Sequence, residues 1–237
     1  MATLRSLWSS EFWEDELPAW PCPDCERGNL RLMEDSLCLC QLPNSSAQIA
    51  YEGFHPDYNF GRFSCMLKCD RCGSPVAMVG DYQSHEHSSN HGITERRMLT
   101  PLSMVPGSPL MTLPASVPEN AAEALRASFV AFWGDRGGSA NRLRISVERI
   151  LDSEEIGKGG SLNDRIAVFG AKHPELEASL HALRHVGNVG SHDGEVGREE
   201  LLDAFEVYQE WLRDHYGQYR TRIKALADKL IGSKGRY

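Results

Sequence analysis

Four cysteines near the start of the sequence have the residue type and the spacing of metal ligands. They form two Cys-x-x-Cys pairs, Cys22 with Cys25 and Cys69 with Cys72. Two thiolates separated by two residues can both turn inward on one tight loop, and two such loops supply the four sulfurs of the tetrahedral site that zinc prefers. The total of seven cysteines is odd, which argues against a disulfide framework. The spacing therefore predicts one structural Zn²⁺ on these four residues, with free thiols as the alternative.

The other three cysteines allow two interpretations. Cys38 and Cys40 alternate onto one face of an expected strand, where they could join Cys65 and a histidine in a second metal site. Buried free cysteine behaves as a small apolar residue, so the preferred interpretation is that Cys38 and Cys40 pack inside the folded domain.

Three histidines form a cluster with the pattern His-x-His-x-x-x-His, namely His85, His87 and His91. Imidazole is a common metal ligand, but the cluster lies in a serine-rich stretch. The sequence therefore favours a solvated loop here, and these histidines are assigned no role.

A second group of reactive side chains lies late in the sequence. Its polar members are Arg184, His185, Asn188 and His192. On a helix, residues four apart drift by about 40° per step, so Arg184, Asn188 and His192 form one polar stripe. Gly187 and Gly190 each cost about 1 kcal/mol of helix stability relative to alanine, which indicates that something approaches their backbone closely. The stripe could bind a phosphate and move a proton. In the alternative, Asn188 and His192 cap the helix and Arg184 pairs with an acidic neighbour.

The elements that position the first four cysteines are expected to be strands. Extended patterns occur at 30–32, 37–40, 63–67 and 75–79. A zinc ribbon with an inserted loop at about 41–60 accommodates the long spacing between the two pairs. Residues 101–117 are rich in proline and small residues, so regular structure is not expected there.

The elements that position the late polar stripe are expected to be helices, because the apolar period changes to three and four residues after Pro118. The expected helices are one ending by Gly134, one ending by Gly157, one capped by Ser161, one opened by Pro174 and a long one from about Arg198 to Leu230. The pattern predicts an all-α bundle of four or five helices joined by short loops.

The composition bounds the class of protein. The chain has 237 residues, of which 41% are hydrophobic and 24% charged, which is ordinary for a packed protein and excludes collagen-like and disordered chains. No apolar run approaches the roughly 20 residues that span a bilayer, and acidic residues interrupt the start of the chain, so we expect no membrane span, no secretory signal and a cytoplasmic location. The net charge of −8 disfavours a general polyanion binder. The basic stretch at 220–236 is assigned to the dipole of a helix C-terminus.

Several of these motifs together resemble a known family. They are the segments 20–25, 28–30 and 67–73, Arg144 with Val147 and Glu148, and Arg184 with Gly187, Asn188 and His192. Over nearly the whole chain they resemble bacterial proteins of domain-of-unknown-function family 4145. That family is similar to the HEPN superfamily, whose members are helical, usually dimeric and in many cases metal-independent ribonucleases of conflict and phage-defence systems.

The resemblance implies roles for the late polar residues. Catalytic HEPN proteins carry an arginine followed closely by a histidine, and Arg184 and His192 match these positions. Seven residues separate them here, which is a longer spacing than the family pattern has. His185 and Asn188 complete the implied site. The resemblance also implies a homodimer that joins near these residues, where the two glycines would permit close approach.

The expected organisation is α+β: a small N-terminal zinc ribbon over 1–100, a proline-rich linker over 101–117 and an all-α HEPN-like bundle over 118–237. Three functions are compatible with it. The first is a dimeric, defence-associated endoribonuclease, in which His192 moves the proton of the attacking or leaving oxygen and Arg184 stabilises the phosphorane. The second is a non-catalytic interaction or regulatory module that binds a nucleotide or an operon-encoded protein partner. The third makes the ribbon a DNA- or RNA-recognition element, which its acidic surroundings disfavour.

Overall fold

The computed structural model of the chain describes residues 5–89, 92–157, 159–192, 195–217 and 219–233. It divides into two compact units, each of which is discontinuous in sequence. The sheet unit consists of Leu4–Pro109 and Phe129–Asp135, and the helical unit contains Leu110–Ser128 and Arg136–Tyr237. The fold is therefore α+β, as the sequence predicts. Among the described residues, no helix combines the length and the apolar character that a membrane crossing requires.

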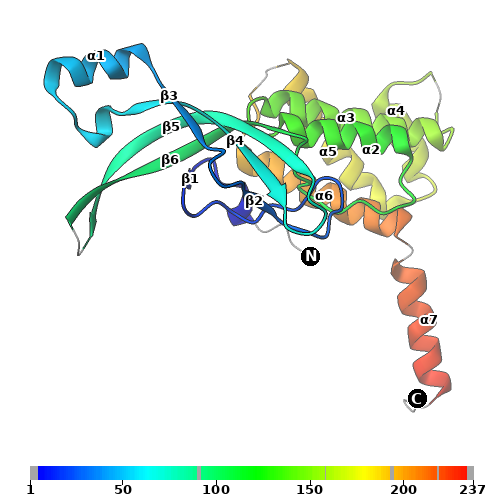
Figure 1. Cartoon of the computed structure of the whole chain (residues 1–237). Helices are drawn as coiled ribbons and strands as arrows, with labels where there is room; N and C mark the ends of the chain where they lie inside the picture. The colour runs from blue at the N-terminus through cyan, green and yellow to red at the C-terminus, as the bar shows by residue number, and fades with distance from the viewer. Residues whose placement is uncertain (1–4, 90–91, 158, 193–194, 218, 234–237) are drawn as a thin grey trace. The chain divides into compact units, whose positions relative to one another are not determined.

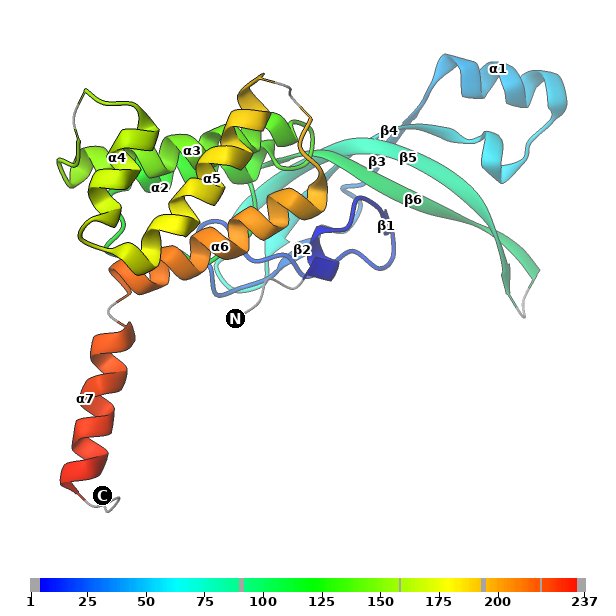
Figure 2. The same cartoon turned by 180° about the vertical axis from the view of Figure 1, so that it is seen from behind.

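The sheet unit is built on one curved antiparallel sheet of six strands (Figures 1 and 2). The strands are β1 (Phe12–Trp13), β2 (Leu30–Leu32), β3 (Cys38–Gln41), β4 (Phe60–Cys69), β5 (Pro75–Ser89) and β6 (Gly92–Val105). Their order is β1-β6-β5-β4-β2, and β3 also pairs with β4. The helix α1 (Pro43–Glu52) and two short 3-10 helices, Arg5–Trp8 and Pro56–Tyr58, complete the unit. The sheet is larger than the small ribbon expected from the sequence, because β5 and β6 form a long hairpin.

Side-chain alternation gives the sheet a buried and an exposed face. Along β4 every second side chain is buried, including Phe63, Cys65 and Leu67. Val76 and Met78 of β5 are fully buried. Burying a side chain of this size contributes about 1.5–3 kcal/mol, so this face provides much of the stability of the unit.

Tryptophan side chains fill the core beside the sheet. Trp133, from the short segment 129–135, lies 5.9 Å from Trp8, 6.0 Å from Trp20 and 6.1 Å from Phe12, measured between ring centroids. The Trp20 indole N–H donates to the Leu7 carbonyl oxygen at 2.6 Å, so its polar atom is satisfied within the core.

Three details of the sheet unit differ from the sequence-based expectation. β6 continues through residues 101–105, part of the segment in which no regular structure was expected. Pro101 fits in the strand because it lies at an irregularity in the pairing of β5 with β6, where a missing N–H is tolerated. His85 and His87 lie on β5 rather than in a loop, and His91 lies outside the described residues. The expected inserted loop contains α1 and the second 3-10 helix.

The helical unit contains six described helices (Figure 2). They are α2 (Glu119–Ala131), α3 (Arg136–Ser153), α4 (Leu162–Gly170), α5 (Pro174–His192), α6 (Arg198–Tyr216) and α7 (Tyr219–Gly232). The expected cap at Ser161 is confirmed, since its hydroxyl accepts a hydrogen bond from the Asp164 N–H. The prediction of one long final helix was wrong, because α6 ends at Tyr216 and a separate helix, α7, begins at Tyr219.

The core of the helical unit is apolar and lies among α2 to α6. Its fully buried members include Leu125, Ile150, Phe169, Leu180, Phe205 and Leu212. The Tyr208 hydroxyl is also buried and lies 2.8 Å from the Ser146 hydroxyl, so this polar pair is satisfied. The side chains of α7 from Arg222 to Ile231 are all exposed and take no part in this core.

A polar cluster joins the ends of α3 and α6. His215 Nε2 and the Tyr216 hydroxyl each lie 2.6 Å from Glu154 Oε1. Burial raises the pKa of Glu154, but the hydrogen bonds from His215 and Tyr216 outweigh burial and hold the pKa below its usual value.

We expect this cluster to make the helical unit less stable in acid. Folding lowers the pKa of Glu154, so the unfolded chain takes up the proton first as the pH falls. The stabilising contribution is present above the ordinary value of 4.5 and is lost as the pH falls through the lower folded value. Urea midpoints of wild type and Glu154→Gln at pH 7 and pH 3 measure it. The substitution should destabilise at pH 7 and have much less effect at pH 3, and an equal effect at both would contradict this assignment.

Candidate functional site

The four cysteines predicted to bind metal meet at one point in the sheet unit. Sγ atoms of Cys22, Cys25, Cys69 and Cys72 all lie within 4.8 Å of one another. Two of the separations, Cys22 to Cys72 and Cys25 to Cys69, are 3.7 Å. A tetrahedral site with Zn–S bonds of about 2.3 Å has S···S edges of about 3.8 Å. The spacing of the sulfurs is thus compatible with a four-thiolate metal site.

Backbone hydrogen bonds hold the two cysteine loops in this arrangement. The N–H groups of Arg71 and Cys72 both point at Cys69 Sγ, at 3.4 Å. The two loops also bind each other, because the Asp70 N–H donates to the Asn29 carbonyl oxygen at 3.0 Å. N–H groups aimed at a sulfur stabilise its thiolate form, which is the form that binds a metal.

Gly28 is required for the close approach of the loops. A Cβ at this position would overlap Cys69 Sγ and lie 2.7 Å from Arg71 Cβ. Gly73 follows the second pair with a φ of +79°, a conformation that L side chains rarely adopt. Both glycines are therefore part of what places the sulfurs.

Among these thiols, Cys22 and Cys72 have pKa values shifted in opposite directions. Burial raises the pKa of Cys22 to about 12. Hydrogen bonding to Ser74 lowers the pKa of the exposed Cys72 to about 6. A divalent cation would deprotonate all four sulfurs, since a coordinating thiol loses its proton outright.

The remaining cysteines do not join this cluster. Cys38 and Cys40 pair with Ser64 and Arg62 of β4 and are exposed, whereas Cys65 is buried on the opposite face. A site that contained all three is therefore excluded by strand register. The preferred interpretation, that Cys38 and Cys40 pack inside, was also wrong, because β3 presents both to solvent.

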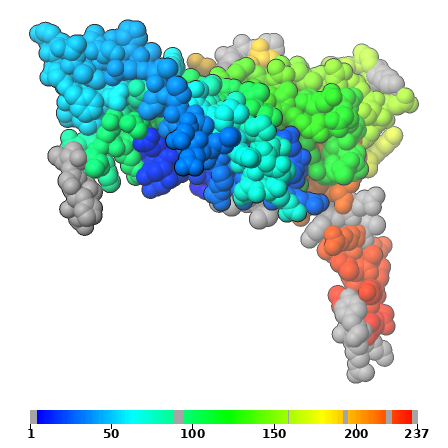
Figure 3. Space-filling view, viewed as in Figure 1, coloured from blue at the N-terminus to red at the C-terminus, as the bar shows by residue number. Residues whose placement is uncertain are grey.

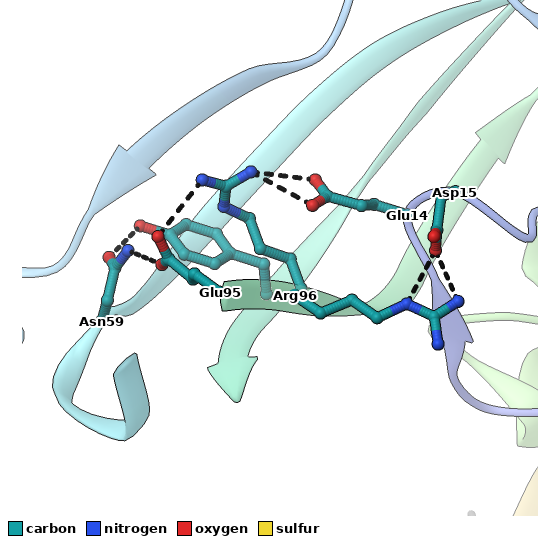
Figure 4. Close-up of polar contacts among 7 residues, drawn as sticks. Glu14, Asp15, Asn59, Glu95 and Arg96 are labelled. Carbon is teal, nitrogen blue, oxygen red and sulfur yellow. Dashed lines mark hydrogen bonds and ion pairs between the residues drawn. The ribbon is translucent and has the colours of Figure 1, made fainter. Parts of the chain in front are cut away.

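The long hairpin carries a second polar cluster, which is occupied by its own ion pairs (Figure 4). Arg97 Nη1 lies 3.1 Å from both carboxylate oxygens of Glu14, and its Nη2 lies 3.5 Å from Glu95. The Asn59 amide donates to Glu95 at 2.6 Å and its oxygen accepts from the Tyr82 hydroxyl at 3.0 Å. Charges paired in this way stabilise the hairpin and offer little to a ligand.

His85 lies beside this cluster without forming a metal site. Its Nδ1 is 3.8 Å from Asp57, and its ring packs edge-on against Trp13 at 5.8 Å between centroids. Within the described part of the chain, the four cysteines are the only group of His, Cys, Asp and Glu with metal-ligand spacing.

The late polar residues lie on α5, as predicted. Arg184 and Asn188 are half-buried and His185 is exposed. Arg184 Nη2 lies 3.1 Å from His185 Nε2, so these two side chains meet. α5 ends at His192, whose side chain lies outside the described residues. The structure thus brings Arg184 and His185 together and leaves the predicted pairing with His192 untested.

The two glycines of α5 face α3 of the same chain. A Cβ on Gly187 would lie 2.5 Å from Arg144 Cβ, and one on Gly190 would overlap the Gly137 carbonyl oxygen. The prediction that something approaches these glycines is confirmed, and the approaching element is α3. The two glycines therefore give no support to a dimer contact, because α3 of the same chain already fills the space beside them.

This close packing places a second arginine beside the α5 stripe. The Cδ of Arg144 would lie 3.2 Å from a Cβ on Gly187. Gly187 itself lies about one helical turn after Arg184 on α5. Arg144 Nη2 lies 3.2 Å from Asn141 Oδ1, which also accepts from the Ser191 hydroxyl at 2.8 Å. Sequence reasoning did not assign Arg144 or Asn141 to the site, although Arg144 was among the motif residues.

The seam between α3 and α5 is therefore polar and carries the guanidinium group of Arg144, and Arg184 lies on α5 three residues before Gly187, against which Arg144 packs. Glu148 neutralises part of the charge of Arg144, with Oε1 at 3.4 Å from Nη1. Arg184 Nε is buried and has no hydrogen-bond partner among the described residues. Guanidinium groups bind carboxylates and phosphates in bidentate fashion, so an anion is the chemical class that this seam can hold.

Comparisons with known proteins match two family models to the chain, one in its N-terminal part and one in its helical part. Residues 10–97 match the family described as Domain of unknown function (DUF8608), and residues 126–233 match the family described as Domain of unknown function (DUF4145). The predicted resemblance to family 4145 is confirmed for the helical part. It does not extend to the cysteine pairs, which lie in the stretch that matches the other family. Neither the curated proteins nor the solved structures gave a match.

Proposed function

We propose that the helical unit binds the phosphodiester backbone of RNA at the α3–α5 seam and cleaves it without a metal ion. The observation that carries this proposal is the packing of Arg144 from α3 against Gly187 of α5, three residues after Arg184, whose Nε is buried without a hydrogen-bond partner among the described residues. The resemblance to HEPN ribonucleases supports it from the sequence.

Each residue of the seam has a role in this proposal. Arg184 stabilises the charge of the phosphorane, and Asn188 and His185 orient the bound phosphate. His192 takes the proton of the attacking 2′-hydroxyl or returns one to the leaving 5′-oxygen. The bond to the 5′-oxygen breaks as the bond from the 2′-oxygen forms, which leaves a 2′,3′-cyclic phosphate end.

The cysteine cluster has a structural role in the proposal. It holds one Zn²⁺ per chain on Cys22, Cys25, Cys69 and Cys72, and four thiolates leave no open position for catalysis. Operation in the cytoplasm, where thiols stay reduced, is consistent with this role. A defence function and an operon-encoded partner remain part of the same proposal, on the family resemblance.

RNA cleavage by matched variants tests the proposal. Wild type should cut a random-sequence oligoribonucleotide pool in buffer without added Mg²⁺, and His192→Ala and Arg184→Ala should each lose at least about 100-fold of this activity. His181→Ala, on the same helix but paired with Glu177, and Arg149→Ala, on α3 but paired with Asp152, should keep it.

Two outcomes would overturn the catalytic proposal. Equal cleavage by wild type and His192→Ala would remove His192 from the chemistry. Binding of RNA or nucleotide that depends on Arg184, with no cleavage by wild type, would favour the alternative of a non-catalytic regulatory module. The neutralisation of Arg144 by Glu148 is the observation that favours this alternative.

A further inference from the structure

The last helix, α7, has an apolar stripe that nothing in the described chain covers. Ile223, Leu226 and Leu230 are spaced three and four residues apart and are 42–44% exposed, and Ile231 is 75% exposed. All side chains from Arg222 to Ile231 are exposed. Figure 3 shows these residues in orange and red, near the C-terminal end of the colour range.

Such a helix needs a partner surface. Isolated helices shorter than about 12–15 residues are marginal in water, and most helical stability in proteins comes from packing an apolar face. α7 has 14 residues and its stripe has the regular spacing of a packed seam. A surface of matching apolar chemistry would stabilise it.

A groove of about 580 Å³ lies at the end of α6, beside the start of α7. One wall is the segment before α2, with the apolar side chains Leu113, Pro114 and Ala115, and the other is α6, with Gln209, Arg213 and Tyr216. The lining is mostly apolar, so the groove accepts a stripe of leucine and isoleucine side chains.

Charge complements this apolar match. The one charged side chain that lines the groove is Arg213, and it lies 3.2 Å from Glu210. α6 as a whole is acidic, with six Asp and Glu residues against two Arg. α7 is net basic, with four Lys and Arg residues against the single Asp228. The same charges disfavour pairing α7 with another α7, because Arg222 and Lys229 flank the stripe on one side.

We propose that α7 of one copy of the chain occupies the groove of a second copy, so that two chains exchange their last helices. The exchange uses the same two surfaces on both chains and closes into a symmetric dimer. Only Gly217 and residue 218 connect α6 to α7, so the alternative in which α7 folds back onto its own groove requires an immediate reversal of the chain. This inference does not depend on RNA cleavage.

Light scattering coupled to gel filtration, at about 20 μM full-length protein, tests the proposal. Wild type should be a dimer, and the double substitution Leu226→Asp with Leu230→Asp should be a monomer. Val168→Asp places the same charge on an equally exposed apolar residue of α4 and should remain dimeric. A monomeric wild type, or a dimer that survives the α7 substitutions, overturns the proposal.

Cysteine cross-linking distinguishes exchange from fold-back. When Ala115→Cys chains are mixed with Leu226→Cys chains, a disulfide-linked heterodimer should form, and a mixture with Val168→Cys chains should not give it. If the chain that carries both Ala115→Cys and Leu226→Cys forms its disulfide within a monomer, α7 folds back and the exchange is wrong.

Discussion

Replacing Cys69 with alanine should remove the bound metal and unfold the sheet unit. Its sulfur is one of the four in the cluster and receives two backbone N–H groups. Binding of structural zinc supplies about 10–16 kcal/mol in small metal domains, which matches or exceeds the total stability of an ordinary domain. Elemental analysis should give one zinc per wild-type chain and none in the variant.

Cys65→Ala is the matched control for this experiment. Cys65 is buried on the same face of the same strand but is not part of the cluster. Its loss removes one small buried group and should cost about 1 kcal/mol. Hydrogen exchange at the β4 and β5 amides reports the unfolding of the sheet unit directly. If Cys69→Ala and Cys65→Ala bind the same amount of zinc and show the same exchange, the four-thiolate site is wrong.

Gly190→Ala should destabilise the helical unit, although helix propensity alone predicts the opposite sign. Alanine favours an exposed helix over glycine by about 1 kcal/mol. At this position the new Cβ would overlap the Gly137 carbonyl oxygen and lie 3.0 Å from Ala140 Cβ, and neither of these groups can rotate away. α3 and α5 would have to separate, and such overpacking costs about 1–3 kcal/mol.

Val189→Ala, at the neighbouring exposed position of α5, is the control and should change stability little. Urea unfolding of the two variants at pH 7 gives the comparison. A more stable Gly190→Ala would show that the two helices do not approach as closely as described. Because Arg144 packs against α5 at this seam, the same variant should also weaken the proposed anion binding.

The features that sequence predicted well depend on local chemistry. The Cys-x-x-Cys spacing forces two sulfurs onto one loop whatever the rest of the chain does, and the Ser161 cap and the start of α5 at Pro174 act within one helical turn. For the same reason Arg184 and His185 could be placed on one helix and found together.

The features that were missed depend on distant partners. His85 resembles a loop residue in its serine-rich context, but β5 is held by its pairing with β6. Arg144 belongs to the candidate site only because α3 and α5 pack at their glycines. The end of α6 at Tyr216 interrupts an apolar pattern that continues into α7, so periodicity gave no signal of the break.

The segment Phe129–Asp135 has a consequence for how the chain can be divided. It follows the start of α2 in sequence, yet Phe132 and Trp133 pack against Trp8 in the sheet unit. A genetic exchange that transferred residues 1–109 alone would leave the donor's tryptophan core without these two rings. The two halves can therefore be shuffled as independent modules only if each new partner supplies equivalent aromatic side chains in this segment. This requirement ties the evolution of the sheet unit to that of α2, which follows it in sequence.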